Sequence, residues 1–241
     1  MSISICFDFG NTRLKAAIFK NKELLEIRVL ENDHPETIQA LLDECKPEKT
    51  ILSSVIHHDK AIEAQLAAHS KFHLLGPATF INFTTPVGKP ETIGADRLAL
   101  VAAAVDLYPN QHNLIISLGT CITYNFVNIA HEFLGGSISP GMQMRFRAMH
   151  EQTALLPLIE ASNEFPLVGY DTKTNLLSGV ILGIAAEIDG IIAAYADKYG
   201  NFNVLLTGGD ISYFVPHIKK RIFADQNLIY KGLYAICKKN N

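Results

Sequence analysis

Hydrophobic and polar positions follow the same order twice along the chain. The first succession opens with three runs rich in β-branched and aromatic residues, separated by Gly and Asn turns, and these predict a meander of strands. We expect the strands at residues 3–9, 13–19 and 23–30. Apolar residues at helical spacing then predict two helices with a short strand between them. We expect these elements at about 35–45, 50–54 and 59–69.

The second succession begins after a turn-rich loop at 77–90 and a helix at 94–107. Strands, helices and a last strand are expected at 113–118, 121–127, 132–139, 142–153, 172–196 and 203–206, and helical segments close the chain. Because FDFGNTRLKAAIF and ISLGTCITYNFV both predict strand, turn and strand, we expect two similar halves facing each other across a cleft. The halves would be residues 1–110 and 111–241. Two unrelated hairpins would give the same local pattern.

The composition is typical of a globular cytoplasmic protein. Hydrophobic residues make up 48% of the 241 and charged residues 19%, which excludes disorder. A net charge of −3 gives no basic surplus for nucleic acid or an anionic membrane. The first residues lack the basic and apolar segments of a signal peptide. None of the four cysteines forms a CxxC pair, which favours reduced thiols.

One long apolar run, residues 176–196, requires a choice between a membrane span and a buried helix. Glu187 and Asp189 lie near its middle. A carboxylate at the centre of a bilayer costs ~3 kcal/mol, so we expect a buried helix in a soluble protein.

Candidate chemistry is concentrated in turns that follow strands. The first is Asp8-Phe9-Gly10-Asn11-Thr12, where glycine lets the backbone approach a phosphate and successive N–H groups form an anion-binding concavity. The Thr12 hydroxyl adds a donor, and the Asp8 carboxylate would help to hold a hydrated Mg²⁺ that bridges phosphates. A hairpin without a ligand explains the same five residues equally well.

Two further glycine turns follow strands in the second half. Ser117-Leu118-Gly119-Thr120 suits the other side of a triphosphate, and Thr207-Gly208-Gly209-Asp210 would let an adenine lie flat on the backbone. Taken alone, the latter is better explained as a strand-to-helix turn with Asp210 as the N-cap. The sequence contains no GxxxxGK[ST] and no GxGxxG, which excludes a Walker loop and a dinucleotide fingerprint.

The tetrapeptide Gly94-Ala95-Asp96-Arg97 opens a predicted helix, where a carboxylate in the first turn is favourable by itself. It also suits a substrate site, because the carboxylate can accept a proton from an attacking hydroxyl and the guanidinium can orient an anionic substrate. By contrast, His57-His58 has no acidic partner at helical spacing, which predicts a solvated pair in a loop.

The motifs DFGNT, GADR, LGT-x-x-T, GGSISPG, TALLP, GYDT and TGGD occur in this order over nearly the whole chain. As an ordered set they resemble type III pantothenate kinases, of the acetate and sugar kinase and actin superfamily. The resemblance implies an α/β fold of two ribonuclease H-like (actin-like ATPase) halves, with mixed sheets flanked by helices. It also implies a cytoplasmic homodimer that transfers the γ-phosphate of ATP to the primary hydroxyl of pantothenate. The product, 4′-phosphopantothenate, begins coenzyme A synthesis.

The resemblance also implies a role for each candidate residue. Asp96 would act as general base toward the pantothenate hydroxyl. The other pantothenate contacts would be Val87, Gly94, Ala95, Arg97 and Thr172. ATP would be bound by Asp8, Phe9, Gly10, Asn11, Thr12, Arg13, Leu14, Lys15, Thr120, Gly208 and Gly209. Asp8 would also hold Mg²⁺ through water, and Ser117 stands where a ligand for K⁺ or NH₄⁺ is expected.

The chain departs from the family pattern at two of these positions. An aspartate ligates the monovalent cation in the family where this chain has Ser117, whose hydroxyl brings no charge, so we expect a weak or absent cation site. A tyrosine lies against the substrate in the family where this chain has Val87. Two alternatives to a pantothenate kinase therefore stay open. One is a kinase for another small alcohol, and the other is a non-catalytic homologue that binds nucleotide or pantothenate.

Overall fold

The chain divides into two compact units in the computed structural model, which describes residues 2–86 and 88–241. Val87, an expected substrate contact, lies outside the described residues. The first unit contains residues 1–109, 130–134 and 227–241, and the second contains residues 110–129 and 135–226. Unlike the predicted first half, the first unit also contains residues 130–134 and 227–241, which come later in the chain.

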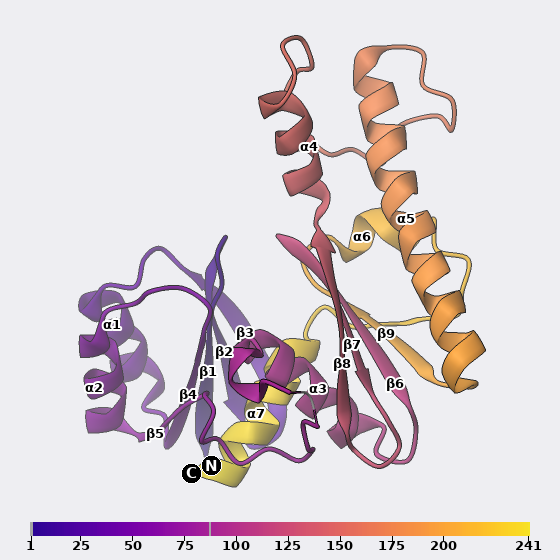
Figure 1. Cartoon of the computed structure of the whole chain (residues 1–241). Coiled ribbons are helices and arrows are strands. Elements are labelled where there is room, and N and C mark those ends of the chain that lie inside the picture. The colour runs from indigo at the N-terminus through magenta and orange to yellow at the C-terminus, as the bar shows by residue number, and fades with distance from the viewer. Residues whose placement is uncertain (1, 87) are drawn as a thin grey trace. The chain divides into compact units, whose positions relative to one another are not determined.

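A five-stranded mixed sheet forms the centre of the first unit, in the order β3-β2-β1-β4-β5 (Figure 1). Strands β1, β2 and β3 form an antiparallel meander, and β4 and β5 extend the sheet from β1 as parallel strands. The strands are β1 (Ile3–Phe9), β2 (Leu14–Lys20), β3 (Glu23–Leu30), β4 (Lys49–Ser54) and β5 (Lys71–Leu74). Alternate β1 side chains point to opposite faces. Ile5, Phe7 and Phe9 join an apolar core with α1 (Pro35–Cys45) and α2 (Lys60–His69).

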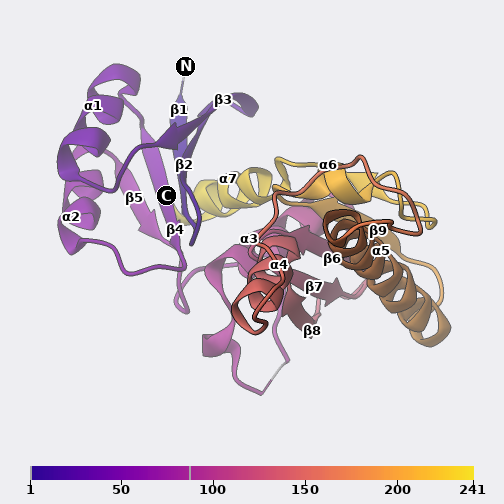
Figure 2. The same ribbon diagram turned by 90° about the horizontal axis from the view of Figure 1, so that it is seen from above.

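The opposite face of this sheet is covered by α7 (Leu228–Asn240), and α3 (Ala95–Leu107) packs against α7 (Figure 2). The two helices approach so closely that a Cβ atom at Gly232 would lie 1.8 Å from the Ala99 carbonyl oxygen. A 3₁₀ turn, η1 (Pro90–Thr92), precedes α3. The first unit is therefore completed by a helix from a distant part of the chain.

The second unit repeats this arrangement with the strand order β10-β9-β6-β7-β8. Its strands are β6 (Asn113–Leu118), β7 (Cys121–Val127), β8 (Phe133–Pro140), β9 (Asn203–Thr207) and β10 (Phe223–Ala224). Strand β6 pairs antiparallel with β7 and parallel with β9, as β1 does with β2 and β4. The repeat confirms the predicted α/β fold of two similar halves built on mixed sheets flanked by helices.

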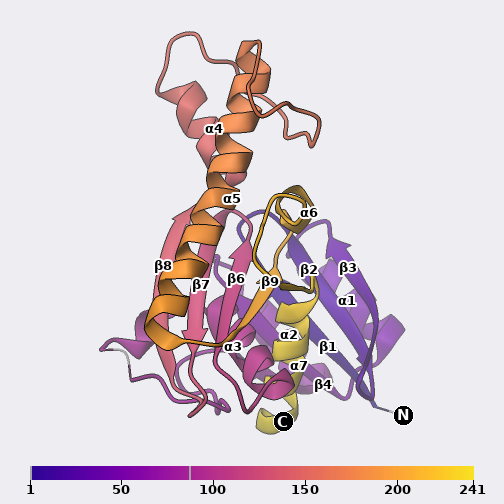
Figure 3. The same ribbon diagram turned by 90° about the vertical axis from the view of Figure 1, so that its right-hand side faces the viewer.

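Helix α5 (Thr172–Tyr199) crosses one face of the second sheet, and α4 (Met142–Glu151) lies beside the N-terminal half of α5 (Figures 1 and 3). The short α6 (Ile211–Phe214) follows β9. The core between α5 and the sheet contains Leu114, Ile116, Tyr124 and Phe126.

By length and composition, α5 could cross a membrane, but half of its most apolar stretch is buried in the structure. Its central carboxylates have partners within the unit. Glu187 accepts hydrogen bonds from the hydroxyls of Tyr124 and Ser139, at 2.9 and 2.6 Å, and pairs with Arg145. Asp189 accepts the backbone N–H of Lys219 at 3.2 Å. Helix α5 is thus the core helix of an α/β unit, as the two carboxylates predict.

Candidate active site

In the first unit, the candidate phosphate turn joins β1 to β2. The Gly10 N–H donates to the Arg13 carbonyl oxygen at 3.2 Å, which closes the turn and leaves Asn11 and Thr12 exposed. Asp8 lies at the end of β1, in register with Lys15 on β2. The turn therefore presents backbone and hydroxyl donors to solvent beside a carboxylate.

The second carboxylate of the first unit, Asp96, lies in the first turn of α3. A Cβ atom at Gly94 would lie 2.5 Å from Asp96 Oδ1, so this carboxylate can fold back over the start of the helix only because residue 94 is glycine. Burial raises the pKa of Asp96, although the backbone N–H and the charge of Arg97 act to lower it. The Arg97 guanidinium lies 5.5 Å from the centre of the Phe133 ring.

Asp8 and Asp96 interact electrostatically. Burial, and then the negative charge of Asp96, raise the pKa of Asp8 to about 6, although Lys15 acts to lower it. Tyr230 on α7 is also affected, since burial and the charge of Asp8 raise its pKa. The structure thus brings together the expected metal-binding carboxylate, the expected general base and the phosphate turn.

The same residues fit a hydrated metal ion shared with phosphates. A cation would relieve the repulsion between the two carboxylates. Among the residues that the structure describes, no group of three His, Cys, Asp or Glu side chains could hold a metal by itself. Mg²⁺ commonly binds through one or two carboxylates, with water and substrate phosphates completing its shell.

In the second unit, three glycine turns meet at one end of the sheet. A Cβ atom at Gly141 would lie 2.0 Å from the Gly119 carbonyl oxygen, and one at Gly208 would lie 2.1 Å from that of Leu118. Gly208 has a φ of +108°, in the region that favours glycine. Gly209 has open space where a side chain would stand. The expected ATP contacts Thr120, Gly208 and Gly209 are therefore brought to one edge.

Ser117 occupies the position in β6 that Asp8 occupies in β1, two residues before the glycine of the turn. It pairs in register with Thr123 on β7 and Thr207 on β9, which gives a row of three hydroxyls on the face away from α5. Hydroxyls can coordinate a monovalent cation, but this row contains no charge. A weak or absent cation site at Ser117 stays a prediction.

The remaining predicted contacts include two side chains in the core of the first unit and one residue of the second unit. Phe9 is fully buried toward α1 and α2, so only its backbone is available to ATP, and Leu14 packs at the edge of the same core. Thr172 is the exposed first residue of α5, between the capping-box residues Asp171 and Thr174. It belongs to the second unit, whereas Gly94, Ala95 and Arg97 belong to the first.

The prediction for His58 is wrong, because this side chain is paired. Its Nδ1 lies 3.0 Å from Ser54 Oγ, and its Nε2 lies 3.1 Å from Glu63 Oε1. The ring also contacts Phe9 edge-on. Glu63 is five residues away, which is not a helical spacing, so no local pattern indicates the pair. The contact supports the end of β4, next to the phosphate turn.

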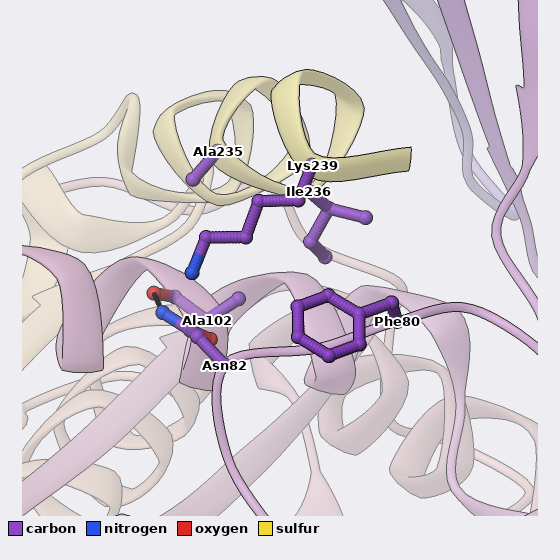
Figure 4. A pocket seen from close by; sticks show the side chains of 6 residues that line it. All are labelled: Phe80, Asn82, Ala102, Ala235, Ile236 and Lys239. Atoms are coloured by element: carbon purple, nitrogen blue, oxygen red, sulfur yellow. Dashed lines mark hydrogen bonds between the residues drawn. The ribbon is translucent and has the colours of Figure 1, made fainter. Parts of the chain in front are cut away.

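Two recesses among the described residues of the first unit lie away from these residues. One, bounded by Phe80, Asn82, Ala102, Ile236 and Lys239, is too narrow to admit water (Figure 4). The other, of about 360 Å³, is lined by Ser2, Ser4 and neighbouring lysines near the start of β1, whereas Asp8 lies near its end. The candidate site is therefore defined by turns and carboxylates.

Comparisons with known proteins agree with this arrangement. The family model described as type III pantothenate kinase matches residues 4–194. The type III pantothenate kinase of Christiangramia forsetii is 39% identical over 240 residues, which cover 99% of each chain.

Solved structures show the same fold. A Campylobacter jejuni protein, named as a candidate transcriptional activator of the Baf family, has a TM-score of 0.62 at 23% identity and covers 98% of each chain. A candidate N-acetylmannosamine kinase from Listeria monocytogenes has a TM-score of 0.54 at 13% identity, covering 99% of this chain and 100% of that one. At such low identities the likeness concerns the fold alone.

The repeated mixed sheets, with glycine turns at the strand ends, define a protein of the actin-like and sugar-kinase fold class. The relatives narrow this class, because they match over the full length and not in the fold alone. The chain belongs to the type III pantothenate kinase family.

Proposed function

We propose that this protein is an ATP-dependent kinase that phosphorylates pantothenate to 4′-phosphopantothenate, the first step of coenzyme A synthesis. Membership of the family supports the substrate pair. The arrangement that carries the proposal is the placement of Asp8 beside the phosphate turn at the end of β1 and of Asp96 in the first turn of α3, where its charge raises the pKa of Asp8.

In this proposal, Asp96 accepts the proton of the primary hydroxyl of pantothenate. The hydroxyl oxygen forms a bond to the γ-phosphorus as the bond from that phosphorus to the bridging oxygen of ATP breaks, which leaves ADP. The raised pKa of Asp96 favours the role, since a base is most effective when its pKa is near the working pH. Arg97 orients the pantothenate carboxylate, and Thr172 adds a polar contact.

The nucleotide is held by residues 8–15, Thr120 and the turn at Gly208 and Gly209. Lys15 and the N–H groups of the first turn neutralise phosphate charge. Asp8 would hold a hydrated Mg²⁺, which would supply positive charge beside the phosphates. Because Ser117 is neutral, we expect a weak dependence on K⁺ or NH₄⁺.

We further propose that the protein is a cytoplasmic homodimer. Large apolar side chains on the second unit are exposed just before α5, with Leu167, Val168 and Tyr170 at 78, 80 and 81%. Exposed apolar groups that gather in one region are typical of interaction sites. An isologous contact between two copies would cover them.

The test is to incubate the purified protein with ATP, Mg²⁺ and pantothenate, in K⁺ buffer and separately in Na⁺ buffer, and to detect 4′-phosphopantothenate by mass spectrometry. We expect product in both buffers, because Ser117 brings no charge to a cation site. Product in K⁺ buffer alone would keep the kinase but contradict the proposal of a weak cation site. A folded protein that forms no product in either buffer would overturn the kinase proposal.

A further inference from the structure

The hydroxyl of Ser53 is enclosed without a hydrogen-bond partner. Ser53 lies on β4 and is 0% exposed. Its Oγ atom has no hydrogen-bond partner among the described residues. Buried polar side chains in folded proteins nearly always have a partner, and an unpaired one lowers stability. Packing within the unit does not explain why a buried hydroxyl without a hydrogen-bond partner is present at this position.

The position of Ser53 indicates which group it would serve. In the parallel pairing of β1 and β4, Ser53 is in register with Asp8. Its neighbour Leu52 enters the core with α1 and α2, so Ser53 points to the other face of the sheet. Asp8 points to that face as well, since its neighbours Phe7 and Phe9 both enter the core with α1 and α2. The hydroxyl and the carboxylate are thus neighbours on one face.

The second unit carries a hydroxyl at the equivalent place. Thr207 on β9 is in register with Ser117 on β6, which corresponds to Asp8. Both units therefore have a hydroxyl side chain beside the residue that precedes the glycine turn. This agreement favours a role that is tied to the turn.

We propose that Ser53 is a positioning residue for phosphoryl transfer, whose hydroxyl donates a hydrogen bond to the Asp8 carboxylate when the nucleotide and its metal ion are bound. The inference rests on the proposed function. A carboxylate that faces a metal ion directs one oxygen toward it and needs a donor to fix the other, and such outer contacts typically contribute 10–100-fold to metal affinity or activity. A hydroxyl that serves this contact needs no other partner within the unit, which agrees with the unpaired Oγ atom of Ser53.

The test compares Ser53→Ala with Thr50→Val. Thr50 lies on the same strand and is equally buried, but its hydroxyl is already paired with Ser70 Oγ at 2.6 Å. Each protein is measured for its melting temperature without ligand, for the upward shift of that temperature with Mg²⁺ and ATP, and for kcat and KM of the kinase reaction.

For Ser53→Ala we expect a melting temperature equal to or above that of the wild type, because an unpaired hydroxyl is removed. We also expect a smaller shift with Mg²⁺ and ATP and a kcat/KM for ATP lower by roughly 10–100-fold. Thr50→Val should show the opposite pattern, with a lower melting temperature, an undiminished shift and ordinary activity. Ser53→Cys, of similar size with a weaker donor, should lie between the wild type and Ser53→Ala.

Two results would overturn the inference for Ser53 while leaving the kinase in place. One is an active wild type with Ser53→Ala unimpaired in activity and nucleotide shift. The other is a ligand-free melting temperature that falls in Ser53→Ala as it does in Thr50→Val, because the hydroxyl would then have a structural partner. A wild type that forms no product would overturn the proposed function, and the inference with it.

Discussion

Asp8 and Asp96 are two carboxylates whose charged forms are disfavoured by the surrounding protein. Both carboxylates are partly buried, and the pKa of each is raised by that burial before any other cause. Removing a carboxylate from water disfavours its charged form. At the scale of single residues, the charged forms of these two neighbouring carboxylates therefore lower the stability of the folded protein.

The role of Asp96 can be tested by Asp96→Asn. We expect kcat to fall by roughly 10²–10⁴-fold, which is the usual contribution of a general base, while the melting temperature is maintained. Steady-state kinetics and thermal unfolding measure both effects. Asp106→Asn, an exposed change on the same helix, is the matched control and should leave both unchanged. An Asp96→Asn enzyme with full activity would remove Asp96 from the mechanism.

Asp8 should affect stability in a way that depends on pH. Its folded pKa, about 6, is above the ordinary value of 3.8, so the folded state binds this proton more tightly than the unfolded state. The stability that comes from the protonated form is complete below about pH 4 and is lost as the pH rises through 6.

Asp8→Asn should therefore raise the free energy of unfolding by about 1–2 kcal/mol near pH 7.5, and by much less near pH 4. The gain is smaller than the full pKa shift would give, because Asp8 is only partly enclosed and water screens its charge. Urea unfolding in metal-free buffer at the two pH values gives the comparison. An equal gain at both values would contradict this account of the Asp8 pKa.

At the scale of elements, one turn of the second unit contains two neighbouring glycines with different requirements. Gly208 is constrained by packing, and Gly209 is not. Gly208 has no room for a Cβ atom and has a positive φ, whereas its neighbour Gly209 has open space. Gly208 is needed for the turn itself, and Gly209 leaves a clear surface beside it. Two alanine substitutions can therefore distinguish the two requirements.

We expect Gly208→Ala to lower the free energy of unfolding by at least about 2 kcal/mol, because of strain and the contact with the Leu118 carbonyl oxygen. Gly209→Ala should change stability by less than about 0.5 kcal/mol and raise KM for ATP, because its methyl group would stand in the space proposed for the adenine. Chemical denaturation and ATP titration measure the two variants. An unchanged KM in Gly209→Ala would indicate that the adenine binds elsewhere.

The carboxylate of Glu187 joins α5 to β7, β8 and α4. The hydroxyls of Tyr124 and Ser139 donate to it, and Arg145 pairs with it, with both charged side chains about one-quarter exposed. Glu187→Ala would leave all three donors without this acceptor. We expect a loss of about 1–3 kcal/mol in the free energy of unfolding.

Asp197→Ala is the control for Glu187→Ala, since Asp197 is exposed on the same helix, and it should change stability by less than about 0.5 kcal/mol. Both are read from urea unfolding curves. A Glu187→Ala protein as stable as the control would mean that α5 is held by its apolar face alone.

The sequence predicts the long elements well because their patterns are strong. The meander strands and α5 follow from alternation, from helical spacing and from the two central carboxylates. It does not predict β5 or β10, because a four-residue strand with two basic side chains and a two-residue strand have too little pattern. Likewise, Ser54, His58 and Glu63 meet through tertiary contacts that no local spacing encodes.

The candidate site was predictable in its turns but not in its couplings. The glycines and Asp96 stand out as residues, and the family resemblance assigns their roles. That Asp8 interacts with Asp96, or that Ser53 lies in register with Asp8, depends on the pairing of β1 with β4 and on the packing of α3 and α7. Hydrophobic periodicity shows that a helix has an apolar face, but it does not show which sheet that face covers.

At the scale of the whole molecule, the exposed apolar side chains of the second unit allow a test of the proposed homodimer. Val168→Glu adds a charge where the side chain is 80% exposed in a single chain, so the monomer should fold normally. Light scattering during size-exclusion chromatography should show a dimer for the wild type and a monomer for Val168→Glu.

Ile129→Glu, at an exposed apolar position near the end of β7, is the matched control and should remain dimeric. A wild type that stays monomeric at every concentration would refute the homodimer. A Val168→Glu protein that stays dimeric would place the contact on another surface.

Helix α7 covers the first sheet although its residues come last. On the ribosome, the first unit is therefore synthesised long before it can close. At roughly 5–20 residues per second, the 227–241 segment follows the first hundred residues by several seconds, during which Cys6, Asp8 and Ile51 lack their cover. During this interval one face of the sheet would be exposed to chaperones. A chain truncated before residue 228 would lack α7, and this face would stay uncovered.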